Sequence, residues 1–301
     1  MTTRYVPAFT VPNNKINMIF DLFSLTKPRL SSLVIFTSAL GLWLAPGQIS
    51  FWKALFSILA TSGLVGGGCV INCWMERDID ALMERTKNRP LPTGRISPEV
   101  ALTLGLTLIT VCLFTLYTVV NPLTAGLGLT AAATYIFLYT PLKKKTSWAL
   151  FAGAIPGAIP PLMGWTTVTN SFGTLGLVLF AILFIWQLPH FLSISLYHAR
   201  DYNNADIKIF PSHIGVRATI HRIAIYTFGL LLVSLVPYYI GSADIFYRNF
   251  ILLLGGAFFI YSLMGYMQDE DSTEQLQWAR RYFYASLIYL PCVFVSMIVF
   301  K

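Results

Sequence analysis

A single polar stripe in this sequence has the residue types and spacing needed to hold a metal ion. Asn72, Glu76 and Asp80 follow an apolar stretch at intervals of four residues. On an α-helix, which turns about 100° per residue, their directions fall within about 80° of each other. Mg²⁺ prefers a few carboxylate and carbonyl oxygens, completed by water and substrate phosphates. The stripe therefore indicates a magnesium site, or alternatively a solvated helix end with ion pairs to Arg77 and Arg85.

Basic residues follow the stripe directly, in the segment ERTKNRPLPTGR. Arg85, Lys87, Arg89 and Arg95 could neutralise a diphosphate, the arginines by paired hydrogen bonds and the lysine as a point charge. The alternative interpretation is that part of this set anchors the chain at a membrane surface.

A second set of polar residues lies farther along the chain. It combines Asp201 and Asp206 with Arg200 and Lys208. Two acidic clusters facing each other across a helical bundle could hold Mg²⁺ ions that bridge a diphosphate. Asp201 and Asp206 are five residues apart, about 140° on a helix, so they share a face only if the backbone is irregular there.

Two histidines lie near the second set. An ionisable residue within a membrane span is a functional candidate by default, so His190 and His198 are candidates to contact a substrate or a substrate iron. Trp186, in the string WQLPHF that contains His190, joins them as a candidate acceptor contact. The alternative is that both histidines are ordinary hydrogen-bonded groups near a helix end.

Composition describes the surroundings of these residues. The 301 residues are 55% hydrophobic and 11% charged, whereas a soluble domain carries about 25% charged residues. The formal net charge is +8, but the basic residues are spread between apolar stretches rather than clustered as a nucleic-acid surface. The sequence therefore predicts an all-α membrane protein with no nucleic-acid partner.

Apolar stretches long enough to span a bilayer, about 20 residues, occur nine times. We expect spans near residues 26–45, 51–74, 98–119, 122–141, 147–167, 172–197, 218–241, 246–268 and 280–300. They predict one bundle of nine helices around a central cavity over 26–301, preceded by an N-terminal arm over 1–25. The fifth span contains three prolines, which predict a kinked cavity wall or, alternatively, plain packing.

Charge is distributed unevenly between the two sides. Of the 21 Lys and Arg, all but Lys53, Arg248 and Lys301 lie on or beside the arm and the connections 75–97, 142–146, 198–217 and 269–279. The positive-inside rule therefore predicts a cytoplasmic N-terminus, and an odd number of spans places the C-terminus outside. Asp244 is the only acid on the opposite side, so we expect the polar chemistry at the cytoplasmic face. Lys143, in the 142–146 connection, is interpreted as part of a membrane anchor.

At this point the chain resembles a known family. The spacing Asn72-x-x-x-Glu76-x-x-x-Asp80 is similar to the first aspartate-rich motif of UbiA-type intramembrane prenyltransferases, although Cys73 and Glu76 stand where that motif has aspartates. Longer strings resemble the protohaem IX farnesyltransferase (haem O synthase) branch: NCWMERDIDALMERTKNRPLPTGRISP, YTPLKKKTSW, GAIPGAIPPLMGW and WQLPHF. The resemblance covers nearly the whole chain.

The resemblance implies a mechanism. Mg²⁺ held by Asn72, Glu76, Asp80 and Asp201 would bind the diphosphate of farnesyl diphosphate, with Asp206 in a less defined metal role. The cations that would neutralise the leaving group are Arg85, Lys87, Arg89, Arg200 and Lys208. The farnesyl group would be transferred to a vinyl group of haem b, and water addition would give haem O.

Other functions remain open from the residues alone. A prenyltransferase of the same superfamily acting on an aromatic quinone precursor would have a similar metal site. A small-anion transporter would also have broken helices and polar groups within the membrane, but its polar groups would lie at the midplane. The orientation and the lack of transit features favour the plasma membrane of a bacterium, and the resemblance suggests a downstream haem-modifying enzyme as a partner.

Overall fold

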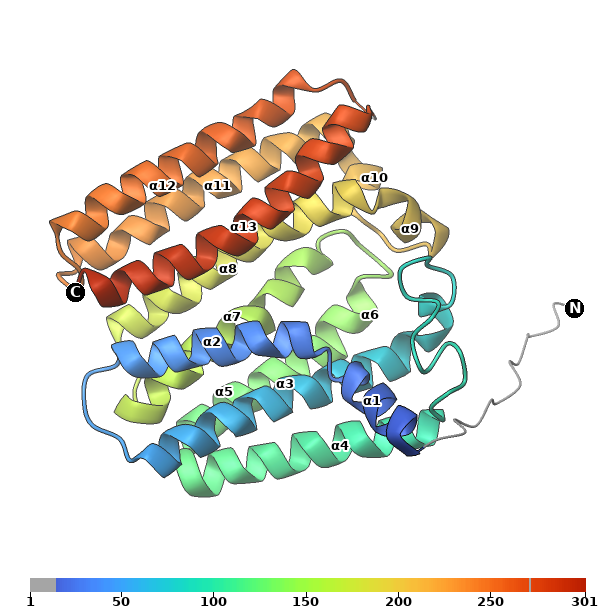
Figure 1. The fold of residues 1–301 in the computed structure, drawn as a ribbon, viewed down its shortest axis with the longest axis horizontal. Helices are drawn as coiled ribbons and strands as arrows, with labels where there is room; N and C mark the ends of the chain where they lie inside the picture. The colour runs from blue at the N-terminus through green and yellow to red at the C-terminus, as the bar shows by residue number, and fades with distance from the viewer. Residues whose placement is uncertain (1–14, 271) are drawn as a thin grey trace, which may run out of the picture.

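The computed structural model describes residues 15–270 and 272–301. In this part of the chain all regular structure is helical (Figure 1). The α-helices are α1 (Lys15–Leu25), α2 (Pro28–Leu44), α3 (Phe51–Asp80), α4 (Pro98–Thr115), α5 (Pro122–Ala133), α6 (Thr140–Leu142), α7 (Ala149–Thr169), α8 (Thr174–Tyr197), α9 (Ala199–Asn204), α10 (Phe210–Ile214), α11 (Val216–Tyr239), α12 (Ile245–Leu263) and α13 (Thr273–Val299).

The predicted spans coincide with helices in the described residues. Seven helical runs are long and apolar enough to cross a membrane. The other two are α2, a shorter apolar helix, and α7, which carries three internal prolines. Large apolar side chains point outward along the bundle, including Phe51, Phe137 and Leu253. So much exposed apolar surface is expected for a protein whose outer solvent is lipid.

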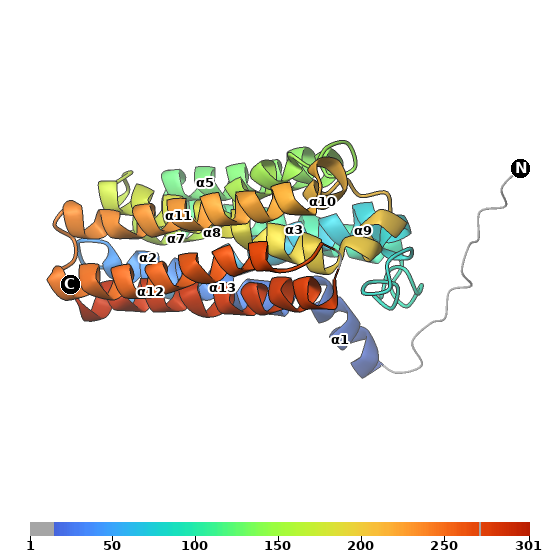
Figure 2. The ribbon, with the colours of Figure 1, turned by 90° about the horizontal axis from the view of Figure 1, so that it is seen from above.

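The helices lie side by side, with their longer connections gathered at one end of the bundle (Figures 1 and 2). This end holds α1, the 81–97 segment, α9 and α10, and we call it the loop end. The C-terminus and the short α2–α3 connection lie at the other end. Because α3 and α8 both finish at the loop end, their polar C-terminal residues are brought to the same side of the molecule.

Helix α3 extends beyond the predicted second span. It begins at Phe51, after the N-cap residue Ser50, whose side chain accepts a hydrogen bond from the Lys53 amide, and it continues as regular helix to Asp80. The 81–97 segment that follows is held by Thr86, whose hydroxyl donates to the Asp80 carbonyl at 2.8 Å. It is also held by a small apolar cluster in which Leu91 and Ile96 pack with α1 and α3 residues. The polar stripe therefore lies on one continuous helix.

The proline-rich helix α7 is used mainly for packing. Pro156, Pro160 and Pro161 are buried inside a continuous helix, and α7 packs closely against α2. A Cβ added at Gly41 would collide with the Pro161 carbonyl, and one added at Gly164 would collide with the Ser38 carbonyl. Glycine is required at both positions because the two backbones approach so closely.

This close approach predicts a strong effect of side-chain volume. Gly41→Val should lower the free energy of unfolding by about 1–3 kcal/mol, because the added atoms push α2 from α7. Chemical denaturation in detergent micelles measures the change. Gly256→Val is the matched control, since a Cβ at Gly256 meets no atom within 4 Å. Equal stability of the two variants would contradict the packing account.

Candidate active site

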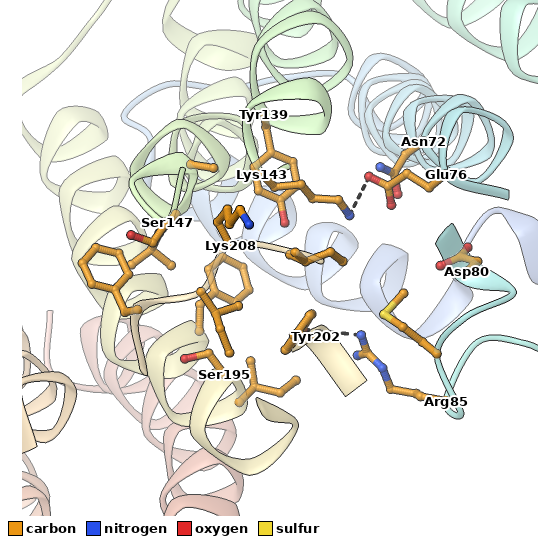
Figure 3. A pocket seen from close by; sticks show the side chains of 18 of the residues that line it. Asn72, Glu76, Asp80, Arg85, Tyr139, Lys143, Ser147, Ser195, Tyr202 and Lys208 are labelled. Atoms are coloured by element: carbon orange, nitrogen blue, oxygen red, sulfur yellow. Dashed lines mark hydrogen bonds and ion pairs between the residues drawn. The ribbon is translucent and has the colours of Figure 1, made fainter. Parts of the chain in front are cut away.

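A pocket of about 360 Å³ opens at the loop end of the bundle, and one wall of it is the polar stripe of α3. Asn72, Glu76 and Asp80 all line the pocket, and each is nearly fully buried. Figure 3 shows their side chains on one side of the cavity. The pocket is otherwise mixed in character, with apolar walls from α8 and from the segment between α9 and α10.

Each residue of the stripe has a cation beside it. Lys27 Nζ donates to Asn72 Oδ1 at 2.9 Å. Lys143 Nζ lies 2.5 Å from Glu76 Oε1, and Arg89 Nη1 donates to Asp80 Oδ2 at 2.7 Å. The three cations come from three different segments of the chain, and all three line the pocket.

Electrostatics explains why these cations are needed. Glu76 and Asp80 lie at the C-terminal end of α3, where the partial negative charge of the helix disfavours acids. Burial removes the water that would otherwise solvate the carboxylates. Burial disfavours the charged form of Arg89, but Asp80, Cys73 and Glu76 together outweigh this effect and raise the pKa of Arg89.

The stripe has the donor chemistry of a divalent metal site. It offers one amide oxygen and two buried carboxylates on adjacent turns of α3, the ligand types that Mg²⁺ prefers. Glu76 Oε1 is buried and forms no hydrogen bond of good geometry with any described residue, although the Lys143 ammonium is near. Within the described residues no group of three or more His, Cys, Asp or Glu could hold a metal. Asn72 and oxygens of a bound substrate would therefore have to complete the shell.

Tyrosines of the helical turn after α5 form the pocket wall next to α3. Residues Thr134–Tyr139 form a π-helical turn between α5 and α6. The stacked rings of Tyr135 and Tyr139 lie in this turn and line the pocket. The same turn brings Thr140 to Asn72, whose Nδ2 donates to the Thr140 hydroxyl at 3.1 Å. Such π-helical turns are frequent at functional sites.

Two of the other predicted cations also reach the pocket. Arg85 lines it and donates to the Tyr202 hydroxyl at 3.4 Å, and Lys208 lines it from the segment after α9 (Figure 3). Two others do not. Lys87 pairs with Glu84 at 2.5 Å, and Arg200 is an exposed residue outside the pocket lining.

The second acidic set is separated rather than brought together. Asp201 lies on α9 and is mostly buried, with Oδ2 4.0 Å from His198 Nδ1. Asp206 follows the end of α9 in a left-handed conformation with φ of 51°. Its side chain is 88% exposed and pairs with Lys208 at 2.6 Å. The irregular backbone turns Asp206 toward solvent, so the structure does not unite it with the stripe.

The candidate acceptor residues occupy α8, beside the pocket. Trp186 and His190 are buried between α8 and α13, and neither lines the pocket. His198 caps the C-terminus of α8. Burial lowers the pKa of His198, and Arg85 and Arg280 reinforce this against the opposing effect of Asp201. This lowered pKa favours the neutral imidazole of His198.

Lys27 and Lys143 are the site residues that sequence reasoning missed. Lys143 belongs to a run of three lysines that also suits a membrane anchor, and Lys27 lies between the N-terminal arm and the first span. The alternation of the predicted spans places both at the same end as the stripe. Buried carboxylates need counter-charges, and this requirement is the signal that could have identified them.

These features define a multi-pass helical membrane protein with a charged pocket at one end. The chain belongs to the UbiA prenyltransferase family, whose sequence model matches residues 34–287. Two relatives carry the name protoheme IX farnesyltransferase. The protein of Myxococcus xanthus is 44% identical, over 92% of this chain and 93% of the relative. That of Anaeromyxobacter dehalogenans is 45% identical, over 99% of both chains.

Solved structures share the fold at low sequence identity. A structure of digeranylgeranylglyceryl phosphate synthase has a TM-score of 0.78 and 15% identity, covering 94% of this chain and 98% of the other. A UbiA homologue from Archaeoglobus fulgidus bound to DMAPP and Mg²⁺ has a TM-score of 0.69 and 15% identity, covering 93% of this chain and 99% of the other.

The pairing of Glu76 with Lys143 can be tested by stability. Lys143→Met should lower the free energy of unfolding by about 3 kcal/mol, because it leaves a buried carboxylate without its cation. The double variant with Glu76→Gln should recover part of this loss, with a coupling of about 1–3 kcal/mol. Denaturation in detergent without substrate measures both. Lys144→Met, at an exposed neighbouring position, should have little effect, and an equally small loss for Lys143→Met would refute the pairing.

Proposed function

We propose that this protein transfers the farnesyl group of farnesyl diphosphate to a vinyl group of haem b in a Mg²⁺-dependent reaction, giving haem O. The observation that carries the proposal is the buried stripe of Asn72, Glu76 and Asp80 with its cations in one pocket. The choice of acceptor is supported by relatives 44–46% identical that are named protoheme IX farnesyltransferase.

In this proposal Asn72, Glu76 and Asp80 hold Mg²⁺. Asp201, the further ligand that the family resemblance implies, lies on α9 outside the pocket lining and could join them only if α9 moved toward the stripe. The metal supplies charge neutralisation of the diphosphate, the leaving group of the transfer. The UbiA homologue solved with DMAPP and Mg²⁺ has the same fold, which agrees with a metal-dependent site. Asp206 has no place in the set, because its side chain is paired with Lys208 and directed to solvent.

The pocket cations would stabilise the departing diphosphate. Arg85, Arg89 and Lys208 line the pocket and would take the role that the sequence predicts for them, and Lys27 and Lys143 would join them. Preorganised cations of this kind are most effective in a site shielded from water. Lys87 and Arg200, outside the pocket, could act only in an early encounter with the substrate, as long-range charges.

Apolar walls would protect the reacting carbon. Leu30, Met83, Phe191 and Ile207 line the same pocket as the charged residues. They would seat the start of the farnesyl chain and keep water away from the allylic cation as the carbon–oxygen bond breaks. The acceptor would approach from the α8 side, where Trp186, His190 and His198 lie.

We also propose that the chain spans the membrane nine times, with residues 1–25 as a cytoplasmic arm and 26–301 as a single domain. Seven described helical runs are long and apolar enough to cross a membrane, and α2 and α7 would supply the other two spans. The basic residues favour the loop end as the cytoplasmic side. Residues 1–14 of the arm lie outside the described part of the chain. The active site would then face the cytoplasm from a bacterial inner membrane, and a haem-modifying enzyme acting on the product would be its partner.

The reaction itself is the test. Purified protein in nanodiscs is incubated with haem b, farnesyl diphosphate and Mg²⁺, and the haem is analysed by mass spectrometry. We expect a haem heavier by one hydrated farnesyl group. EDTA should abolish this product and Asp80→Ala should reduce it at least about 100-fold, because the leaving group loses its metal. Asp78→Ala is the matched control on α3, with its side chain 89% exposed, and should retain activity.

Other outcomes would redirect the assignment. If haem stays unchanged and 4-hydroxybenzoate is prenylated, the acceptor is an aromatic quinone precursor. If no acceptor reacts and diphosphate is never released, the prenyltransferase proposal fails for this chain. The small-anion transporter would then become the hypothesis to test.

A further inference from the structure

A buried polar cluster surrounds His190, between α8 and α13. His190 Nδ1 lies 2.7 Å from Ser286 Oγ. The Ser286 hydroxyl donates its single proton to the Phe283 carbonyl at 2.6 Å. Ser286 Oγ must therefore accept from His190, which places the imidazole proton on Nδ1. The lone pair of the neutral ring is left on Nε2.

Nothing in the described residues uses that lone pair. Nε2 has no hydrogen-bond partner among the described residues, and it is not fully buried. His190 keeps 8% of its surface exposed, and Nε2 contributes to this exposed part. The lone pair is therefore accessible to a ligand.

The neighbouring rings fix the orientation of the imidazole. Trp186 stacks on His190 with ring centroids 4.5 Å apart, and Phe283 does so at 4.6 Å. Trp186 is itself anchored by its Nε1, which donates to the Ser286 carbonyl at 2.8 Å. A metal–imidazole bond lies in the plane of the ring, so stacked neighbours steady the ligand without blocking it. Metal-bound histidines characteristically donate their second N–H to a hydrogen-bond acceptor, and Ser286 Oγ is that acceptor for His190.

A cation lies on the same face of α8, toward the loop end. Tyr197 follows His190 by seven residues, about 20° around the helix and about 10 Å along it. The guanidinium of Arg280, from α13, covers the Tyr197 ring at 5.6 Å and the Tyr284 ring at 5.9 Å. Arg280 makes no ion pair with any described residue, so it is free to bind an anion.

We propose that α8 and α13 form the porphyrin-binding surface, with His190 Nε2 as the axial ligand of the iron and Arg280 as the partner of the propionates. This inference rests on the proposed function and adds the residues that hold the acceptor. Neutral imidazole suits a transition metal, and arginine suits carboxylates. The vinyl-bearing edge would then face the candidate active-site pocket, because Phe191 and Ile194, which follow His190 on α8 toward the loop end, line that pocket.

Spectroscopy of bound haem tests the ligand without turnover. Full-length protein in nanodiscs is titrated with haem b and followed by absorption and resonance Raman spectra. We expect a histidine-ligated spectrum that His190→Ala abolishes, with affinity reduced at least about tenfold, and that added imidazole restores. His221→Ala is the matched control. His221 Nδ1 also pairs with a hydroxyl, that of Tyr266, but in an exposed position, and its loss should leave the spectrum unchanged.

Two results would overturn the ligand assignment. One is a histidine-ligated spectrum that survives in His190→Ala, and the other is its loss in His198→Ala instead. If His190→Ala does not fold, Ser286→Ala carries the test. That variant removes the acceptor of the Nδ1 proton and should shift the iron–histidine stretching band, whereas an unshifted band would refute the account.

The propionate contact is tested by charge. Arg280→Gln should weaken haem binding about tenfold and leave the binding of haem dimethyl ester unchanged, with Arg281→Gln as the neighbouring control. Equal loss with both porphyrins would refute the contact.

Failure of the inference and failure of the proposed function give different results. If haem is farnesylated but its iron is ligated without His190, only the inference fails. If His190 ligates the iron but haem is never farnesylated, only the proposed function fails.

Discussion

Two buried carboxylates at the C-terminal end of α3 impose the constraint on which the loop end of this protein depends. Glu76 and Asp80 are shielded from water and face the unfavourable end of the helix dipole. Lys143 pairs with Glu76 and Arg89 pairs with Asp80, and Lys27 donates to the neighbouring Asn72. These cations come from the start of α2, the end of α6 and the 81–97 segment. Neutralising the stripe therefore ties together parts of the chain that are distant in sequence.

The same arrangement suits the proposed chemistry. A site that already gathers carboxylates and cations at short distance can exchange internal pairs for a metal and a diphosphate with little rearrangement. The apolar side of the pocket then meets the part of the substrate that must stay dry. The polar end faces the loops and the apolar helices face lipid, so an amphipathic prenyl diphosphate and a membrane-bound acceptor can reach one pocket together.

Sequence reasoning found the features that are local. The nine helical ranges follow from runs of apolar residues, and the common face of Asn72, Glu76 and Asp80 follows from helical spacing, because α3 continues to Asp80. Features that depend on pairing across the bundle were not accessible. The positions of Lys27 and Lys143 beside the stripe are fixed by tertiary contacts. Lys87, a predicted diphosphate contact, pairs instead with Glu84 outside the pocket lining.

Local irregularity also escaped prediction. Asp206 turns away from Asp201 because the chain takes a left-handed conformation after α9, which no periodic pattern indicates. The π-helical turn that aims Tyr135 and Tyr139 into the pocket lies inside an unbroken apolar stretch. Three prolines in α7 predicted a kinked wall or plain packing, and the close contact of α7 with α2 favours packing.

The central claim is that the α3 stripe binds a metal together with a diphosphate. The most direct measurement is electron paramagnetic resonance of Mn²⁺, used in place of Mg²⁺, with and without a non-hydrolysable thiolo analogue of farnesyl diphosphate. The account predicts protein-bound Mn²⁺ with phosphorus hyperfine coupling when the analogue is present, and loss of that signal in Asp80→Asn. Bound Mn²⁺ without phosphorus coupling, or an unchanged signal in Asp80→Asn, would contradict it.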